Sequence, residues 1–319
     1  MFNIVGIIAE AIRYGAAFLY GSTGEIIIEK SGHLNLGIPG IMCMGAIGGC
    51  TGARLGMQMS SSSFVIVIMA ILFAMLFAGI TGLIYGFFTI SLRCNQNVTG
   101  LVLTTFGTGV LGYWSSLMGD KDISFARVSK VFTTSLFGEV GTDWFSKIFL
   151  SHGILVYLAI IIAVIVAIVL KRTRTGLSLN AIGENPAAAD AAGIKVTKYK
   201  YISCIVGASI AGIGGAFYYL DCTRGSIEPG VIDAMGWLAV ALVIFSLWRP
   251  GIAVFGSFVF GFLYVLPNYI PGIGVAEKIL INIVPYCVTA LVLIIISLFN
   301  KRETQPPAAL GLTYFREER

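Results

Sequence analysis

Long stretches without Asp, Glu, Lys or Arg constrain this chain more than any other feature of its sequence. They run over residues 55–92, 94–119, 148–170, 201–220, 250–276 and 279–299. A helix needs about 20 predominantly apolar residues to cross a bilayer, and each stretch is long enough. The apolar run at 155–170 also lacks the alternation of apolar and polar residues that marks a β-barrel strand. The sequence therefore predicts an all-α, polytopic membrane bundle.

The composition excludes a water-soluble globule. Hydrophobic residues make up 57% of the chain and charged residues 12%, whereas soluble domains carry roughly 25% charged residues. The formal net charge is +5, but the basic residues lie mainly where predicted spans end, which is the pattern of membrane orientation. We therefore expect membrane lipid around the chain and no nucleic-acid partner.

The chain divides into a predicted transmembrane domain, residues 1–300, and a short cytoplasmic tail, residues 301–319. Nine spans are expected, near residues 2–22, 36–54, 64–92, 97–118, 148–170, 200–220, 234–248, 251–269 and 278–299. Eight or ten spans are the alternatives, because residues 24–40 mix charges with Gly and Pro. Such a segment suits a broken or re-entrant element, which a membrane tolerates only where protein or a watery cavity surrounds it.

Loop charges set the expected orientation, because cytoplasmic loops of membrane proteins are rich in Lys and Arg. Residues 171–200 hold six basic and two acidic residues, so this loop is predicted to be cytoplasmic. Residues 119–147 hold four of each and are predicted to be external. Alternating sides from these loops puts the C-terminus in the cytoplasm and the N-terminus outside. Glu10 and Arg13 interrupt the first apolar stretch, so no cleaved signal is expected.

The sequence lacks the motifs of nucleotide-hydrolysing enzymes and metal sites. It contains no GxxxxGK[ST] segment, so the chain is not expected to hold a nucleotide or hydrolyse ATP. His33 and His152 are far apart, and no two cysteines form a CxxC pair, so no set of metal ligands is predicted. We expect a protein that is not an enzyme, binds no metal and carries no cofactor of its own.

Two glycine-rich segments lie within predicted spans. Gly107, Gly109 and Gly112 form a literal GxGxxG, but a dinucleotide site needs that pattern between a strand and a helix. Residues 207–216 likewise repeat Gly, Ala and Ser at helical spacing. Small residues let membrane helices approach closely. Both segments are therefore predicted to be sites of helix packing.

The predicted cytoplasmic loop contains the signals of a short helix between residues 184 and 193. Asn185 suits the N-cap, Pro186 the first helical position and Gly193 the C-terminal cap. A helix this short is marginal alone in water, so other groups must hold it. It either packs on its own bundle or docks, through its small Ala side chains, into a groove on a cytoplasmic partner.

These loop residues resemble the coupling loop of permease subunits in the ABC importer family that handles simple sugars, nucleosides and branched-chain amino acids. The residues to which the resemblance assigns coupling to an ATPase are Gly183, Glu184, Asn185, Pro186, Ala188, Ala189, Asp190 and Gly193. Residues 24–40 are similar to the N-terminal motif of the nucleoside-type branch, and residues 236–250 to its C-terminal half. One departure is Pro39, where that branch usually has an acidic residue.

The resemblance implies a type II-like permease that imports a nucleoside across a bacterial inner membrane. It also implies a second permease chain, a cytoplasmic ATPase that uses ATP and Mg, and an extracellular or periplasmic solute-binding lipoprotein. The same family also offers simple sugars, riboflavin and branched-chain amino acids as solutes. An ATP-independent channel or facilitator is the alternative of another class, although a channel has no use for a docking helix.

Polar and aromatic residues in or beside the spans form the predicted solute pathway, since unpaired polar groups are costly in lipid. They are Asn35, Asn97, Thr99, Thr104, Thr105, Phe106 and Trp114. Their amides and hydroxyls suit sugar hydroxyls or base edges, and their rings suit stacking on a base. For each of them, ordinary hydrogen bonding or packing between helices is the alternative.

Overall fold

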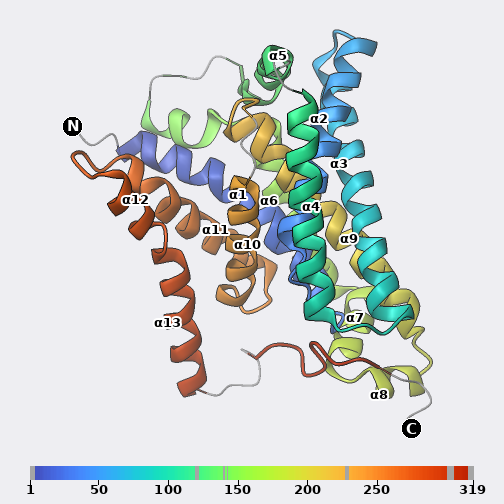
Figure 1. The fold of residues 1–319 in the computed structure, drawn as a ribbon. Coiled ribbons are helices and arrows are strands. Elements are labelled where there is room, and N and C mark those ends of the chain that lie inside the picture. Colours follow the sequence, from blue (N-terminus) through green and yellow to red (C-terminus); the bar gives the residue numbers. More distant parts are fainter. Residues whose placement is uncertain are drawn as a thin grey trace.

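The computed structural model describes residues 4–118, 122–138, 141, 143–226, 230–299 and 305–314, and within them every regular element is helical (Figure 1). The α-helices are α1 (Ile4–Glu29), α2 (Ile38–Met59), α3 (Ser63–Gly86), α4 (Gln96–Met118), α5 (Asp122–Thr133), α6 (Ile154–Arg172), α7 (Arg174–Glu184), α8 (Pro186–Ala191), α9 (Val196–Phe217), α10 (Val231–Phe245), α11 (Pro250–Val265), α12 (Val275–Ile281) and α13 (Val284–Phe299). The π-helical segments are η1 (Phe87–Ser91), η3 (Ser146–Leu150) and η4 (Tyr218–Cys222), and η5 (Leu266–Asn268) is a 3-10 turn. The predicted all-α bundle is confirmed.

Among the described residues, six segments are long and apolar enough to cross a membrane. They are Ile4–Glu29, Ser63–Ser91, Ile154–Arg172, Val196–Cys222, Pro250–Asn268 and Val275–Ile295. α2 and α4 are similar in length but richer in Gly and polar residues, and α10 has 15 residues. The predicted number of nine spans is therefore not confirmed, although a helix occupies each predicted range.

α1 continues to Glu29, past the predicted end of the first span at residue 22. Residues 24–29, which the sequence analysis placed in a broken or re-entrant segment, are therefore helical. Both carboxyl groups are buried and have donors: Asn35 Nδ2 donates to Glu25 Oε2 at 3.1 Å, and Trp248 Nε1 donates to Glu29. Buried polar groups persist where such partners exist, so the helix carries these two carboxyl groups into the bundle.

The turn between α1 and α2 is buried and held by side chains from other helices. Tyr85 OH donates to the Leu34 carbonyl at 2.8 Å, and Gln96 Oε1 accepts from the Leu34 amide at 2.8 Å. Thr104 Oγ1 donates to the Leu36 carbonyl at 2.8 Å. This turn is a break surrounded by protein, as residues 24–40 suggested. Its backbone groups are satisfied without water, as membrane depth requires.

Glycines allow the central helices to cross at close range. A Cβ atom on Gly215 of α9 would overlap the carbonyl oxygen of Met42 on α2, and one on Gly45 of α2 would overlap Gly212. The predicted packing role of residues 207–216 is confirmed. Pro39 is buried at the start of α2, where a Cβ atom on Gly236 of α10 would overlap it. Pro39, the residue that departs from the family pattern, therefore lies in the contact between α2 and α10.

The three glycines of the GxGxxG segment in α4 differ in how closely other atoms approach them. A Cβ atom on Gly107 would overlap Gly40 of α2, so this glycine packs as predicted. Nothing lies within 4 Å of a Cβ atom built on Gly109 or Gly112. The packing prediction is therefore wrong for these two glycines within this chain, because they face away from the bundle.

The predicted external loop contains a helix that the sequence analysis did not identify. α5 buries Phe125, Val128 and Phe132 against the bundle, a spacing of three and four residues that places them on one helix face. Figure 1 shows α5 at one end of the bundle and α7 and α8 at the other. The two loops expected on opposite sides of the membrane are thus at opposite ends of the molecule.

The described part of the predicted tail, residues 305–314, packs back on the bundle beside α7 and α8 (Figure 1). We call it the C-terminal segment. The Ala309 amide donates to the Gly183 carbonyl at 2.8 Å, and the Gly311 amide donates to the Gly32 carbonyl at 3.1 Å. The part of the predicted tail that the structure describes is thus bound to the helices.

Replacing Trp248 with Phe should destabilise the chain by about 1–3 kcal/mol, because the buried Glu29 carboxyl group loses its indole donor. The midpoint of thermal unfolding in detergent measures the effect. Trp144→Phe is the matched control, since Trp144 is 64% exposed. Equal midpoints for the two variants would show that the Trp248–Glu29 hydrogen bond does not stabilise the end of α1.

Candidate functional site: the coupling loop and the outer face of α4

The short helix of the coupling loop forms where the sequence predicts it. α8 spans Pro186–Ala191, Asn185 Oδ1 accepts from the Ala188 amide at 3.0 Å, and Pro186 occupies the first helical position. Gly193 ends the turn with a φ of +84°, a left-handed conformation that favours glycine. Each predicted capping role is confirmed, so both ends of this six-residue helix have a fixed backbone conformation.

α8 has an inner face and an outer face. Ala189 is only 4% exposed and packs with Ile182 and Val196. The outward-facing small side chains are those of Ala187, Ala188, Ala191 and Ala192. A partner that docks on this helix therefore contacts this outer face, whereas Ala189 fixes α8 to its own chain. Packing of the loop helix on its own bundle is therefore confirmed for the inner face, and docking on a partner stays a prediction for the outer face.

The bend between α7 and α8 is tightly fixed to the end of α1. A Cβ atom on Gly183 would overlap the Lys30 carbonyl oxygen, and the C-terminal segment bonds the Gly183 carbonyl from the other side. Burial lowers the pKa of Lys30, the Glu184 carboxylate opposes that shift, and the Arg249 guanidinium adds to it. The bend before α8 is thus held to the end of α1 by backbone contacts rather than by flexible side chains.

Asp190, the second acidic residue of the coupling loop, bonds to the C-terminal segment. Its Oδ2 atom accepts from Tyr314 OH at 2.9 Å. Glu184 and Asn185 are exposed, and Pro186 is half-buried. The eight coupling residues predicted from the sequence therefore form one contiguous element, with exposed and inward-facing members.

The structure does not bring the predicted pathway residues together. Asn35 is fully buried and bonds to Glu25 and to the Gly37 amide, and Thr104 bonds to the α1–α2 turn. Trp114 is half-buried against Phe125, with ring centroids 5.8 Å apart. These three side chains support the packing of the bundle.

The other predicted pathway residues lie on or beside an outward-facing strip of α4, which runs along the front of the bundle in Figure 1. Asn97, Thr105 and Phe106 are exposed, and Thr99 is half-buried. Their threonine hydroxyls bond to their own helix: Thr99 Oγ1 donates to the Asn95 carbonyl at 2.8 Å, and Thr105 Oγ1 to the Leu101 carbonyl at 3.1 Å. We define the outer face of α4 by six of its exposed residues, Asn97, Thr105, Phe106, Gly109, Tyr113 and Ser116.

The outer face of α4 differs from the exposed faces of α3 and α6. Those helices expose aliphatic side chains, namely Leu72, Leu76 and Ile80 on α3 and Ile161, Ile165 and Ile168 on α6. α4 also exposes aliphatic residues, namely Val98, Leu101, Val102 and Leu117, but it adds to them an amide, hydroxyls, aromatic rings and glycine. Polar groups and small residues are characteristic of surfaces that contact protein or a watery path rather than lipid.

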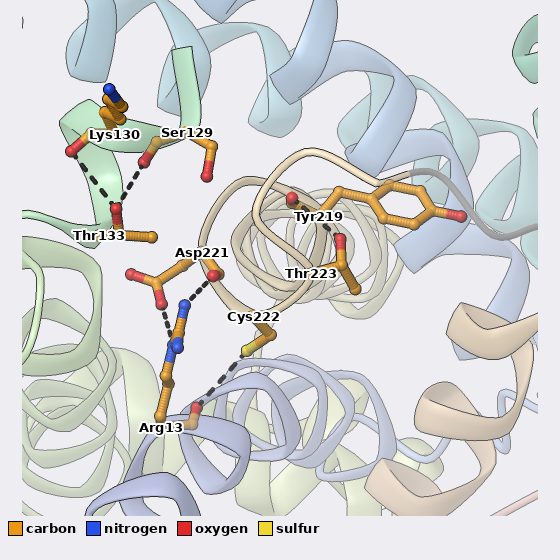
Figure 2. Close-up of polar contacts among 8 residues, drawn as sticks. All are labelled: Arg13, Ser129, Lys130, Thr133, Tyr219, Asp221, Cys222 and Thr223. Atoms are coloured by element: carbon orange, nitrogen blue, oxygen red, sulfur yellow. Dashed lines mark hydrogen bonds and ion pairs between the residues drawn. The ribbon is translucent and has the colours of Figure 1, made fainter. Parts of the chain in front are cut away.

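A buried ion pair near the opposite end of the bundle was not predicted. Arg13 of α1 bonds to both the carboxylate and the backbone carbonyl of Asp221, which is 2% exposed (Figure 2). Cys222 Sγ also lies 4.0 Å from the Arg13 carbonyl oxygen. The partners are 208 residues apart, so no local pattern could have paired them. The pair fixes α1 to η4 and keeps both charges within protein.

Comparisons of the sequence with known proteins find similar proteins among transporter permeases. The family model described as the permease component of branched-chain amino acid transport systems matches residues 7–297. A putative glucose ABC transporter permease of Haloferax volcanii is 31% identical, in an alignment that covers 82% of this chain and 76% of that protein. Nucleoside ABC transporter permease NupC of Lactococcus lactis is 28% identical, in an alignment that covers 98% of this chain and 97% of that protein.

Two further comparisons cover nearly the whole chain. Guanosine ABC transporter permease NupQ of Bacillus subtilis is 28% identical, in an alignment that covers 99% of each protein. The solved structure described as an inward-facing conformation of a putative metal-chelate type ABC transporter has a TM-score of 0.50 and 14% sequence identity. It covers 90% of this chain and 84% of that one, a likeness of fold alone.

Proposed function

Because the chain belongs to the family of ABC transporter permease components of the branched-chain amino acid type, we propose that it imports a nucleoside together with a second permease chain, a cytoplasmic ATPase and an external solute-binding lipoprotein. It is a multi-pass membrane transporter subunit rather than an enzyme. The observation that carries the proposal is the pairing of a fixed coupling helix at one end of the bundle with an unpartnered polar face along α4.

Nucleoside is the preferred solute for two reasons. The two relatives that match nearly the full length of this chain are named for nucleoside and guanosine transport. The outer face of α4 also carries hydroxyl, amide and aromatic groups but no charged residue. Such a surface suits a neutral solute with hydroxyls and a base, whereas a charged solute calls for a compensating charge within the membrane.

The second permease chain is proposed to face α4. Gly109 and Gly112 have open space around them, and Phe106 is 53% exposed. In a membrane, small residues at an unpacked helix surface allow a second helix to approach closely. The solute path then runs between the two chains along the outer face of α4, which explains why its polar residues do not converge on a pocket inside this chain.

The ATPase is proposed to contact the outer face of α8 and to use ATP and Mg on the cytoplasmic side. The basic loop that contains α8 favours this orientation, in a bacterial inner membrane. Because the C-terminal segment bonds to Gly183 and Asp190, it lies on the same side as α8. This arrangement favours an importer over a channel that works without ATP.

Uptake into reconstituted vesicles tests the proposal. With all partners present, labelled nucleosides should enter in an ATP-dependent manner, whereas ribose, riboflavin and leucine should not. Vesicles without the ATPase are the control. Entry of one of the other solutes in place of nucleosides would overturn the solute assignment but leave the family unchanged. Equal nucleoside entry without the ATPase would favour a facilitator.

A further inference from the structure

A polar cavity of about 490 Å³ lies at the α8 end of the bundle. Its walls come from the start of α9, the turn after α8, the turn between η1 and α4, and the C-terminal segment. The residues that determine its chemistry are Arg93, Lys195, Lys200, His33, Asp190 and Thr197. Three cationic side chains stand against one carboxylate, so the lining has a formal charge of +2 with His33 neutral. The cavity is therefore suited to an anion.

Lys200 is the most informative of these residues. It lines the cavity but is only 5% exposed. Within the part of the chain that the structure describes, its ammonium group has no hydrogen bond or ion pair. An ammonium removed from water costs several kcal/mol unless it is paired. A basic residue that served only to orient the loop would lie in solvent, as Lys198 does two positions earlier.

Among the described residues, no carboxylate forms an ion pair with Lys200. Burial and the nearby Lys200 ammonium hold the pKa of His33 well below its usual range, so His33 is neutral. The Asp190 carboxylate accepts a hydrogen bond from Tyr314 OH at 2.9 Å, which directs that oxygen toward the C-terminal segment. The positive charge of Lys200 is therefore left facing the cavity.

Backbone donors add to the same site. Val196 and Thr197 line the cavity in the first turn of α9, and no side chain caps this helix. Free amide groups and the positive end of the helix dipole favour an anion there. Arg93, in the turn between η1 and α4, also lines the cavity. The lining thus combines cationic side chains and the first turn of a helix from two segments that lie far apart in sequence.

We propose that this cavity binds a phosphate-bearing anion, with Lys200 as its buried anchor and Arg93 and Lys195 at its rim. The same chemistry is offered by free phosphate in the cytoplasm and by the phosphate of a lipid headgroup. The bound anion would contact the start of α9, the turn after α8 and the C-terminal segment together. It would therefore stabilise the element on which the proposed ATPase contact depends. The solute of the transporter does not enter this argument.

Thermal unfolding of the full chain in neutral-lipid nanodiscs tests the site. Inorganic phosphate is titrated at constant ionic strength with chloride as the balancing anion, and the rise of the midpoint gives an apparent Kd. Lys200→Met should weaken phosphate binding at least tenfold, while Lys200→Arg should keep it. Lys198→Met is the matched control, because Lys198 lies exposed on the same helix outside the cavity. Removing a buried charge does not threaten the fold.

A second set of unfolding measurements distinguishes free phosphate from a lipid headgroup as the source of the bound anion. Stabilisation by free phosphate in neutral nanodiscs identifies a soluble anion. Stabilisation of the wild-type chain over Lys200→Met only in nanodiscs that contain phosphatidylglycerol identifies a lipid headgroup. The proposal is overturned if neither arm stabilises the wild-type chain, or if Lys200→Met and Lys198→Met respond alike. Such a result leaves the proposed nucleoside import untouched, because uptake is measured separately.

Discussion

Ala188→Trp is expected to reduce ATP-dependent uptake to the level of vesicles without the ATPase. Ala188 is exposed on α8, whose caps and packing hold it in one position. An indole on the outer face prevents the close backbone approach that small side chains allow. The inner face is unchanged, so the chain itself should fold normally. Co-purification of the ATPase with the chain measures the loss of contact, and solute capture by the binding protein should stay intact.

The position of the Trp substitution on α8 determines whether a loss of uptake reports lost docking or a displaced helix. The coupling assignment from the sequence alone would favour Ala189→Trp, but Ala189 packs against Ile182 and Val196. A Trp at that position would displace α8 from its own chain and abolish uptake for a different reason. Ala126→Trp is the matched control, since Ala126 is exposed on α5 at the other end of the bundle. Normal transport by Ala188→Trp would refute the docking role of α8.

Gly215→Val is expected to prevent the chain from folding, with a loss of stability well above ~3 kcal/mol. The added Cβ atom would overlap the carbonyl oxygen of Met42, and backbone cannot move aside as a flexible side chain can. Since α2 and α9 cross at this point, the strain reaches the centre of the bundle. Size-exclusion profiles and thermal midpoints of the detergent-purified chain measure the result.

Gly109→Val is the matched control for this loss. Gly109 lies on α4 with no atom within 4 Å of the added Cβ, so the isolated chain should fold as the wild type does. Its effect should appear only when the second permease chain is present, as weaker co-purification of the pair. A folded, stable Gly215→Val chain would show that the α2–α9 crossing tolerates separation. Unchanged pairing by Gly109→Val would place the second permease chain elsewhere.

Local chemistry explains which parts of the structure could be predicted from the sequence. The cap residues Asn185 and Gly193 act within one turn of chain, so their roles could be identified before any fold was known. The existence of most helices could also be predicted, because each apolar stretch is a continuous piece of the sequence. The extension of α1 to Glu29 could not be identified, because its buried carboxyl groups depend on donors from Asn35 and Trp248. Those donors are supplied by tertiary structure.

The polar residues of α4 show what could not be predicted from the sequence. Thr99 and Thr105 were assigned to a pathway because polar groups are costly in lipid, yet each hydroxyl bonds to a carbonyl four residues earlier in its own helix. Composition could not distinguish this local bond from a solute contact. The empty surroundings of Gly109 are more informative, and they required coordinates to be seen.

The bonds of the C-terminal segment also fix an order of events in biosynthesis. Residues 305–314 leave the ribosome after every helix that they contact, so the hydrogen bond from Ala309 to Gly183 forms after those helices have been synthesised. Until then, the coupling loop lacks the hydrogen bonds from the C-terminal segment to Gly183 and Asp190. A chain shortened to end before residue 305 would keep the described helices but not these two bonds, so its α8 would be held less firmly.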